Sequence, residues 1–379
     1  MNNVVLCVDI GTTSLKAALV TAVGEVVYFC SFPFEEPHDR FVACSWYAAF
    51  FRAVEELAAE VVREDSSVCV AGISISGNGP TVVTDCGLTF RWNEDTGAVE
   101  ELVPDIARSS LFIPKILSVK KQFPEVWKKT KRLFSGPEYL IYVLTGNAVT
   151  ILPETRFEKA YWNDEMLAAC DIKDSLLPDF IKTGETCGIL NIEEDLGLKF
   201  AENCPVIAGG PDFIAALIGT GTLEEGCLCD RCGSSEGLNF CSSKPLKGEG
   251  LRILPSVIPG LWNASYLIPD SGELSVKERL NQINKGICCL QKAAEEAGID
   301  FPAKMSVTGG QTNDELLLRE KSELLGMKIM HPLVLFDGKP FVHSELMGDA
   351  CAAWFGLGKY ASLQEAAENV VRLQPYENL

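Results

Sequence analysis

The first third of the chain alternates between short apolar runs and polar turns, a pattern that predicts strands. Four runs of apolar residues of this kind cover 4–8, 15–20, 26–32 and 68–75. Between the third and fourth runs, apolar residues recur at helical spacing from Trp46 to Val61, with Ser45 placed as an N-cap. Three strands, a helix and a further strand are the order of a mixed sheet, antiparallel first and then parallel after a crossover.

The middle of the chain is less regular. Helical patterns cover 115–127 and 131–145, and Gly146 follows the second as a helix-ending residue. The segment 153–188 is irregular, with a helix that ends near Cys170. The basic cluster of Lys128, Lys129, Lys131 and Arg132 is expected to be a solvated helix face.

The strand pattern then returns. We expect strands at 205–208, 227–232, 238–241 and 304–307. We expect helices at 213–219, after Ser275, at 314–325, at 348–358 and after Ser362, where Ser275 with Glu278 and Ser362 with Glu365 form caps. The second half thus opens, like the first, on a strand hairpin, which suggests an internal duplication of a βββαβ-like unit.

Composition adds limits to this picture. The 379 residues favour two domains, and 47% hydrophobic with 22% charged residues is typical of a globular protein. A net charge of −19 argues against a nucleic-acid partner. No apolar run is long enough to span a membrane and the start lacks a signal-peptide pattern, so we expect a cytoplasmic protein without a membrane partner.

The 15 cysteines show no secreted framework and are expected to be reduced. Cys229 and Cys232 form a C-x-x-C pair, and Cys227 and Cys241 lie nearby. A zinc site would need a second pair or histidines, and the chain has only three histidines, none of them near. Strand positions explain these cysteines better than a metal site does.

Two acids follow predicted strands at positions suited to chemistry. Asp9 ends the first strand, and Gly11, Thr12, Thr13 and Ser14 form the turn after it. Backbone N–H and hydroxyl groups of such a turn can donate to phosphate oxygens, and a carboxylate beside them suits Mg²⁺. An ordinary hairpin turn is the alternative.

Asp212 is the second such acid. It follows Gly209 and Gly210 between a strand and a helix. This position suits chemistry, but it is also that of a helix cap, and as an isolated feature the cap is the better interpretation. Two later turns repeat the phosphate-binding pattern, at 233–235 and at Gly309-Gly310 before a helix.

With these motifs in view, the chain resembles the FGGY carbohydrate kinases, a branch of the actin-like ATPase superfamily, and their xylulokinase-like members most of all. The resemblance extends nearly from end to end, in order and spacing. It is carried by DIGTTSLKAAL at 9–19, GISISG at 72–77, GPEYLIYVLTG at 136–146, PVIAGGPDFIAALIGTG at 205–221, CGSSEG at 232–237 and TGGQTND at 308–314.

The resemblance implies an α/β fold of two actin-like, ribonuclease H-like domains of the βββαβα type with mixed sheets and a cleft between them. The domains are expected at 1–221, on the sugar side, and 222–379, on the nucleotide side and shortened. It implies transfer of the γ-phosphate of ATP to a hydroxyl of a ketose or polyol, most of all a xylulose-like sugar, in the presence of Mg²⁺. A homodimer is one further expectation.

The resemblance also assigns roles to single residues. Asp212 matches the general base and Asp9 the Mg²⁺ ligand of the family. The residues that match the ATP-binding segments are Gly11, Thr12, Thr13, Ser14, Gly233, Ser234, Ser235, Gly309, Gly310 and Asn313. The residues expected on the sugar are Asn78, Gly79, Trp92, Asn93, Asp212 and Phe213.

The sequence departs from the family pattern at several points. Asn78-Gly79-Pro80 replaces the usual Gln-Met-His, Phe213 replaces Asn or Gln, and Glu236 adds negative charge beside a phosphate-type turn. These departures and the short second half motivate an alternative, a catalytically silent nucleotide-binding protein that acts by regulation or interaction. A further alternative is another actin-like enzyme, such as an acyl-phosphate kinase or a reductase-activating ATPase.

Overall fold

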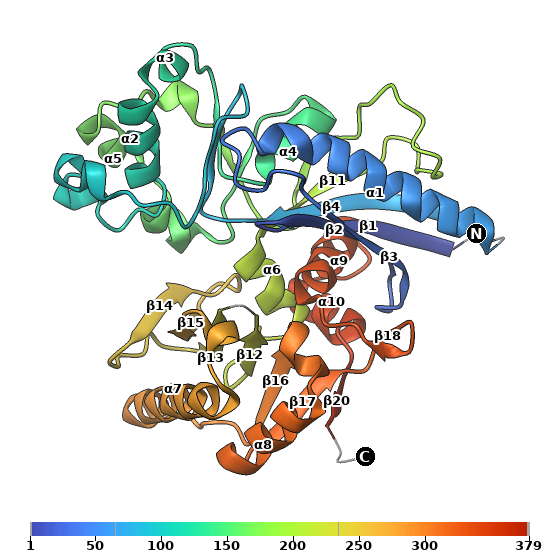
Figure 1. Cartoon of the computed structure of the whole chain (residues 1–379), viewed down its shortest axis with the longest axis vertical. Coiled ribbons are helices and arrows are strands. Elements are labelled where there is room, and N and C mark those ends of the chain that lie inside the picture. The colour runs from blue at the N-terminus through green and yellow to red at the C-terminus, as the bar shows by residue number, and fades with distance from the viewer. Residues whose placement is uncertain (1, 65, 234, 377–379) are drawn as a thin grey trace.

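The computed structural model describes residues 2–64, 66–233 and 235–376. Its two large β-sheets lie in two lobes, one above the other in Figure 1, and helices lie between and outside them. The sheet of the upper lobe comes from the first half of the chain and that of the lower lobe from the second. The predicted α/β fold with mixed sheets in two lobes is confirmed.

The upper sheet has the strand order β10-β11-β4-β1-β2-β3. Its strands are β1 (Asn2–Ile10), β2 (Ser14–Thr21), β3 (Val26–Pro33), β4 (Val68–Gly77), β10 (Thr186–Ile189) and β11 (Pro205–Pro211). The first three are antiparallel, whereas β4 is parallel to both β1 and β11, as the sequence predicts. The carboxyl ends of β1, β4 and β11 therefore meet at one edge of the sheet.

The lower sheet repeats this topology in the order β14-β15-β13-β12-β16-β17-β20. Its strands are β12 (Leu228–Cys232), β13 (Glu236–Ser242), β14 (Leu251–Pro255), β15 (Trp262–Ile268), β16 (Lys304–Thr308), β17 (Lys328–Pro332) and β20 (Leu373–Pro375). Here β12, β13 and β15 are antiparallel, and β12, β16 and β17 are parallel. The matching strand orders support the predicted duplication; the domain boundary at 221/222 stays a prediction.

Helices cover both faces of the upper sheet and the outside of the lower one (Figure 1). The ten α-helices assigned in the described residues are α1 (Ala43–Arg63), α2 (Ile113–Gln122), α3 (Pro124–Trp127), α4 (Glu138–Thr145), α5 (Asp164–Ala169), α6 (Asp212–Gly219), α7 (Val276–Ala297), α8 (Glu315–Leu325), α9 (Ser344–Gly356) and α10 (Leu363–Val370). The short strands are β5 (Val82–Thr84), β6 (Thr89–Phe90), β7 (Leu133–Phe134), β8 (Thr150–Ile151), β9 (Phe180–Ile181), β18 (Leu335–Phe336) and β19 (Lys339–Pro340). The 3₁₀ turns are η1 (Gly97–Leu102), η2 (Asp105–Ala107), η3 (Thr155–Ala160), η4 (Asp174–Leu176), η5 (Ser271–Glu273) and η6 (Gly310–Asn313).

Helices α6 and α9 lie between the two sheets and pack against each other very closely (Figure 1). A Cβ atom on Gly219 would lie 1.9 Å from the Ser344 carbonyl oxygen, and one on Gly348 would lie 1.8 Å from that of Ala215. Only glycine leaves room for such an approach of two backbones. The crossing fixes Asp212, the first residue of α6, relative to the start of α9.

Three local predictions were wrong. Val42, not Ser45, is the N-cap of α1, and the Ser45 hydroxyl donates to the Val42 carbonyl inside the first turn. The helix predicted at 131–145 begins only at Glu138, because Pro137 starts it and β7 precedes it. The helix predicted at 115–127 is interrupted at Phe123, before Pro124, so that it forms α2 and α3.

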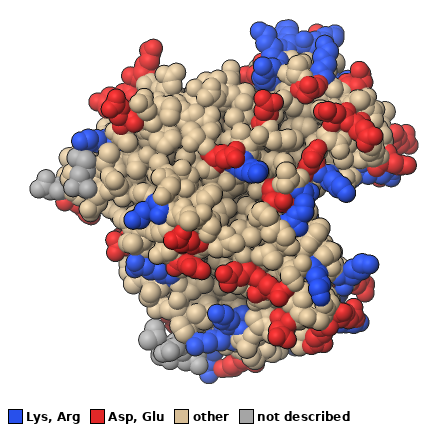
Figure 2. Space-filling model, turned by 180° about the vertical axis from the view of Figure 1, so that it is seen from behind, with Lys and Arg blue, Asp and Glu red and all other residues tan. Residues whose placement is uncertain are grey.

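Each lobe has its own core, and a third cluster includes residues of the layer between the sheets. In the described part of the chain, none of the helices combines the length and the apolar character needed to cross a membrane. All 15 cysteines are free thiols. The cluster of Lys128, Lys129, Lys131 and Arg132 is exposed and follows α3. Figure 2 shows basic side chains gathered at the upper right, the corner where α3 lies when Figure 1 is turned to this view.

Candidate active site

Asp9 lies at the edge where the parallel strands of the upper sheet end. It is buried next to Lys16, whose Nζ lies 3.0 Å from its Oδ2. Strand pairing explains the contact, since Asp9 of β1 faces Lys16 of β2 in the antiparallel register. Burial raises the pKa of Asp9, and the charge of Lys16 offsets part of that effect. The other oxygen, Oδ1, is buried without a hydrogen-bond partner among the described residues.

Asp212 begins α6 directly after β11, and its Oδ1 accepts a hydrogen bond from the backbone N–H of Phe213 at 2.6 Å. The side chain is partly accessible to solvent, but the surrounding protein raises its pKa to about 7. Arg231 lowers this pKa, whereas the negative charges of Asp9 and Glu345 raise it. Asp9 and Asp212, which are 203 positions apart in sequence, therefore belong to one charged cluster.

Arg231 and Glu345 complete this cluster from the second half of the chain. The Arg231 Nη2 atom lies 3.0 Å from Glu345 Oε1, which joins β12 to the first turn of α9. Burial would raise the pKa of Glu345, but Arg231, a backbone N–H and Lys16 outweigh it and keep the pKa below its ordinary value. Glu345 is therefore an anion that holds the guanidinium in place.

The segments predicted to bind sugar lie beside the first turn. Thr12 Oγ1 donates to Asn78 Oδ1 at 3.3 Å and accepts from Trp92 Nε1 at 3.2 Å. The buried Lys115 holds this loop from behind, because its Nζ donates to the Trp92 carbonyl at 2.9 Å. Trp92 itself is 45% exposed, so its ring face is available to a ligand.

The remaining predicted sugar residues lie around Asp212. A Cβ on Gly79 would lie 3.1 Å from Pro211, the residue before Asp212, so the two loops touch. Phe213 is half-buried and packs against the core between the lobes. Asn93 is exposed beside Trp92.

The turn after β12 lies against the turn after β16. The Gln311 side-chain amide donates to the Gly233 carbonyl, and a Cβ on Gly309 would lie 2.4 Å from the Cys232 carbonyl oxygen. Ser235 Oγ accepts from the Asp270 N–H at 3.4 Å. The 3₁₀ turn η6 begins at Gly310 and ends at Asn313, in the segment after β16. Ser234 lies outside the described residues.

In the first half, the turn residues Gly11, Thr13 and Ser14 form a closed loop. The Gly11 N–H donates to the Ser14 carbonyl at 2.9 Å, and the Thr13 carbonyl accepts from the Phe34 N–H at 2.9 Å. Gly11 lies close to the charged cluster, since a Cβ there would be 3.7 Å from Lys16 Nζ.

The expectation that Glu236 disfavours an anion at the second turn was wrong. Glu236 points into the lower lobe, where the fully buried Lys321 pairs with it at 2.9 Å and also with Asp230. Asp230, Cys232 and Glu236 are close enough to hold a metal ion, but the Lys321 ammonium already lies among them. Cys229 and Cys232 are both buried in β12, but they are three positions apart and so lie on opposite faces of the strand rather than at alternate positions on one face.

Sequence reasoning missed Lys16, Arg231 and Glu345. Lys16 and Arg231 carry a signal that was available: each is a charged residue inside a predicted strand, two positions from a phosphate-type turn. It also missed Asp349 of α9, which is fully buried and accepts from the hydroxyls of Ser74 at 3.1 Å and Ser76 at 2.8 Å. These bonds connect α9 to β4 beneath the cluster.

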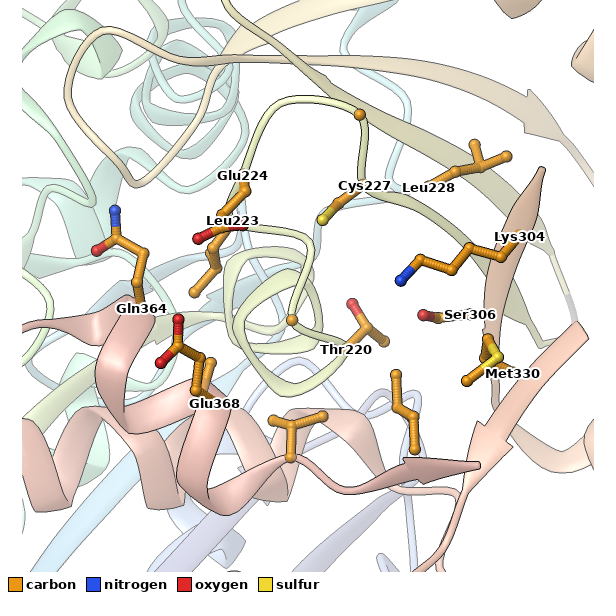
Figure 3. A pocket seen from close by; sticks show the side chains of 15 residues that line it. Thr220, Leu223, Glu224, Cys227, Leu228, Lys304, Ser306, Met330, Gln364 and Glu368 are labelled. Carbon is orange, nitrogen blue, oxygen red and sulfur yellow. The ribbon is translucent and has the colours of Figure 1, made fainter. Parts of the chain in front are cut away.

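A separate cavity of about 330 Å³ opens at the other end of α6 from Asp212. Figure 3 shows that Lys304 points into it from one side and Glu224, Gln364 and Glu368 lie on the other. None of the predicted site residues that the structure describes lines it. It is therefore not part of the cluster described above.

Comparison with known proteins agrees with the sequence resemblance. The family model "FGGY family of carbohydrate kinases, N-terminal domain" matches residues 106–219. The xylulose kinase of Lactococcus lactis subsp. lactis (strain IL1403) is 27% identical over 287 residues, which cover 68% of this chain and 57% of that protein. Two further xylulose kinases are matched over 51% and 54% of their length. The chain thus spans little more than half the length of these relatives.

Solved structures extend the similarity of fold over the whole chain. A xylulose kinase from Rhodospirillum rubrum superimposes with a TM-score of 0.76 at 16% identity, covering 99% of this chain and 94% of that one. A Plasmodium falciparum glycerol kinase, solved with ADP, gives a TM-score of 0.76 at 15% identity, covering 98% and 93%. The resemblance stated from the sequence is confirmed.

Proposed function

We propose that the chain acts as an FGGY carbohydrate kinase and transfers the γ-phosphoryl group of ATP to a hydroxyl group of a ketose or polyol. A xylulose-like sugar is the first candidate, because most of the curated relatives described above are xylulose kinases. The observation that carries the proposal is the charged cluster in which Asp9, Lys16, Asp212, Arg231 and Glu345 meet.

In this proposal Asp212 is the general base. As the new bond forms between the sugar oxygen and phosphorus, and the bond from phosphorus to the β,γ-bridging oxygen breaks, Asp212 accepts the hydroxyl proton. A carboxylate with a pKa of about 7 is a far better proton acceptor than an ordinary one near neutral pH. The contact of Pro211, the residue before Asp212, with Gly79 supports a position of this base beside the loop proposed to hold the sugar.

Asp9 fits a magnesium ligand in this scheme. Carboxylate oxygen is the ligand that Mg²⁺ prefers, and Asp9 Oδ1 is buried with no other partner among the described residues. Mg²⁺, when bound, neutralises phosphate charge in reactions of this kind. Lys16 holds the second oxygen, so it orients the carboxylate.

The proposed ATP-binding residues are the three turns. The first is Gly11 to Ser14, the second Gly233 to Ser235, and the third Gly309, Gly310 and Asn313. The contact between the second and third turns supports a continuous surface for one nucleotide. Asn78, Gly79, Trp92, Asn93 and Phe213 are proposed on the sugar side.

A sugar panel tests the function. Purified protein is assayed for ADP release with ketoses, polyols and sugar acids, with xylulose first. Asp212→Asn should reduce turnover by on the order of 10²–10⁴-fold, because Asn keeps the bond from the Phe213 N–H but cannot take the proton. Asp105→Asn, at an exposed acid paired with Arg108, is the matched control and should leave turnover unchanged.

The same assay decides on the alternative of a silent nucleotide-binding protein, which the altered loop at Asn78-Gly79-Pro80 motivates. If ATP binds in calorimetry but no sugar stimulates ADP release, the kinase proposal fails and that alternative is supported. The expected homodimer and cytoplasmic location stay predictions, for light scattering and cell fractionation to test.

A further inference from the structure

We infer that Arg231 contacts the phosphoryl group during its transfer, and that Glu345 is the positioning residue that aims the guanidinium. The inference rests on the proposed kinase function and adds a catalytic residue to it. Neither residue belongs to the turn motifs from which the nucleotide site was proposed.

Strand geometry directs Arg231 toward the site. Side chains alternate between the two faces of a strand, and in β12 Asp230 and Cys232 point to Lys321 inside the lower lobe. Arg231 must therefore point to the opposite face, where α9 begins, and its contact with Glu345 confirms this direction. Gly233, the start of the second phosphate-type turn, follows two residues later.

Arg231 has unused hydrogen-bond donors in this position. In the described residues its contact with Glu345 uses Nη2 alone, although a guanidinium carries five N–H donors. The side chain is 26% exposed, and none of its nitrogen atoms is among the buried atoms without a partner. Solvent therefore reaches the donors that Glu345 leaves free, and a planar fork of this kind suits phosphoryl oxygens.

Its charge acts at the point where the reactants would meet. Arg231 stabilises the ionised forms of both Asp9 and Asp212, so it lies near the proposed metal ligand and the proposed base together. Lys16, the other cation of the cluster, donates to Asp9 and keeps further N–H donors. Arg231 differs from it in offering a planar fork of donors to charge that develops on phosphorus oxygens, a role in which arginine is effective in other phosphoryl-transfer enzymes.

Glu345 holds the Arg231 guanidinium from the layer between the two sheets. It lies in the first turn of α9, whose close packing on α6 at Gly348 also fixes Asp212. The pair Arg231–Glu345 consequently connects the guanidinium to the same rigid layer as the proposed base. We expect Glu345→Gln to leave part of this function, because the amide oxygen still accepts from Nη2.

Substitution with two readouts tests the inference. Arg231→Met should lower kcat by on the order of 10³-fold or more, with the sugar KM within threefold of wild type, and Arg231→Lys should recover part of the loss. Without any sugar, wild type should bind Mg²⁺ and ADP more tightly when aluminium fluoride is added as a mimic of the transferred group. Arg231→Met should bind ADP with wild-type affinity, but aluminium fluoride should not tighten that binding. Arg319→Met, at an exposed arginine paired with Glu323, is the control.

Removal of Arg231 leaves Glu345 unpaired, so the double variant Arg231→Met/Glu345→Leu serves where the single variant does not fold. Three results would overturn the inference. The kcat of Arg231→Met could stay within threefold of wild type, or its affinity for ADP could fall as much as its turnover. Aluminium fluoride could also fail to tighten the binding of ADP to wild type. If wild type turns over no sugar, the kinase proposal fails, and the fluoride titration still decides on Arg231.

Discussion

At the scale of single residues, the environment of Asp212 gives a prediction about pH. Its pKa of about 7 has burial as the main cause, with Asp9 and Glu345 raising it and Arg231 lowering it. A general base works only when deprotonated, so activity is lost as the pH falls through the pKa and is complete above it. We expect kcat/KM for the sugar to rise through an acid limb centred near pH 7.

The pH profile of kcat/KM between about pH 5.5 and 9, with saturating Mg²⁺ and ATP, checks this expectation. Asp105→Asn should show the wild-type profile, since that acid is exposed and remote from the site. A profile that is flat over this range, as expected for a carboxylate that titrates at its ordinary, lower pKa, would contradict the assignment of Asp212 as the base.

Single residues also mark the limit of what the sequence can predict. The turns that contain Asp9 and Asp212 could be located, because strand ends and glycines have a local signature. Arg231 has a local signal, two positions before such a turn, but its pairing with Glu345 could not be predicted, since it depends on a contact across 114 positions and on the face of β12 that points to α9. Glu236 was misjudged for the same reason: its partner Lys321 lies 85 positions away.

At the scale of elements, the crossing of α6 and α9 predicts a severe cost for a single methyl group. A Cβ on Gly348 would lie 1.8 Å from the Ala215 carbonyl oxygen and 2.6 Å from its carbon, both backbone atoms that cannot rotate away. Overpacking usually costs roughly 1–3 kcal/mol, and a backbone clash belongs at or above the upper end. Gly348→Ala should therefore lower the free energy of unfolding by about 3 kcal/mol or more, measured in urea.

Gly237→Ala is the matched control for that measurement. A Cβ at Gly237 would have Asn239 Nδ2 as its nearest neighbour at 3.6 Å, an ordinary contact, so the free energy of unfolding should change little. Equal stability of the two variants would show that the helices can separate at no cost, which would remove the rigid layer on which the site geometry depends.

The elements themselves were predictable to different degrees. The strands at the centre of each sheet and the long helices were found because their apolar patterns are clear, as in β1, β4 and α7. The strands β10, β14, β15, β17 and β20 were not predicted. The region of α2 to α4 was not, because prolines at 124 and 137 divide patterns that look helical. The capping box of Ser275 and Glu278 and the cap at Ser362 were correct, because a Glu three residues later completes the local signature, which the wrongly predicted cap at Ser45 lacks.

At the scale of the whole molecule, the two-lobed architecture was predictable, because the second half of the chain repeats the strand pattern of the first. The contacts between the two lobes were not predictable. One such contact lies where β3 meets the segment before α9. Phe29 stacks on His343 at a centroid distance of 4.7 Å and meets Phe336 and Phe341 edge-on at 5.8 and 5.4 Å. This aromatic group joins the edge of the upper sheet to a hairpin from the second half of the chain.

The position of this contact predicts that Phe29 couples the stabilities of the two halves. Phe29→Ala removes three aromatic contacts from a half-buried position, which should cost on the order of 2 kcal/mol. Hydrogen exchange followed by mass spectrometry should show faster exchange in β3 and also in 335–343. Phe32→Ala is the control, because Phe32 lies on the same strand but contacts Arg52 of α1 within the upper lobe. Phe32→Ala should speed hydrogen exchange near α1 and leave residues 335–343 protected. If residues 335–343 are equally protected in Phe29→Ala, the aromatic contact does not couple the lobes.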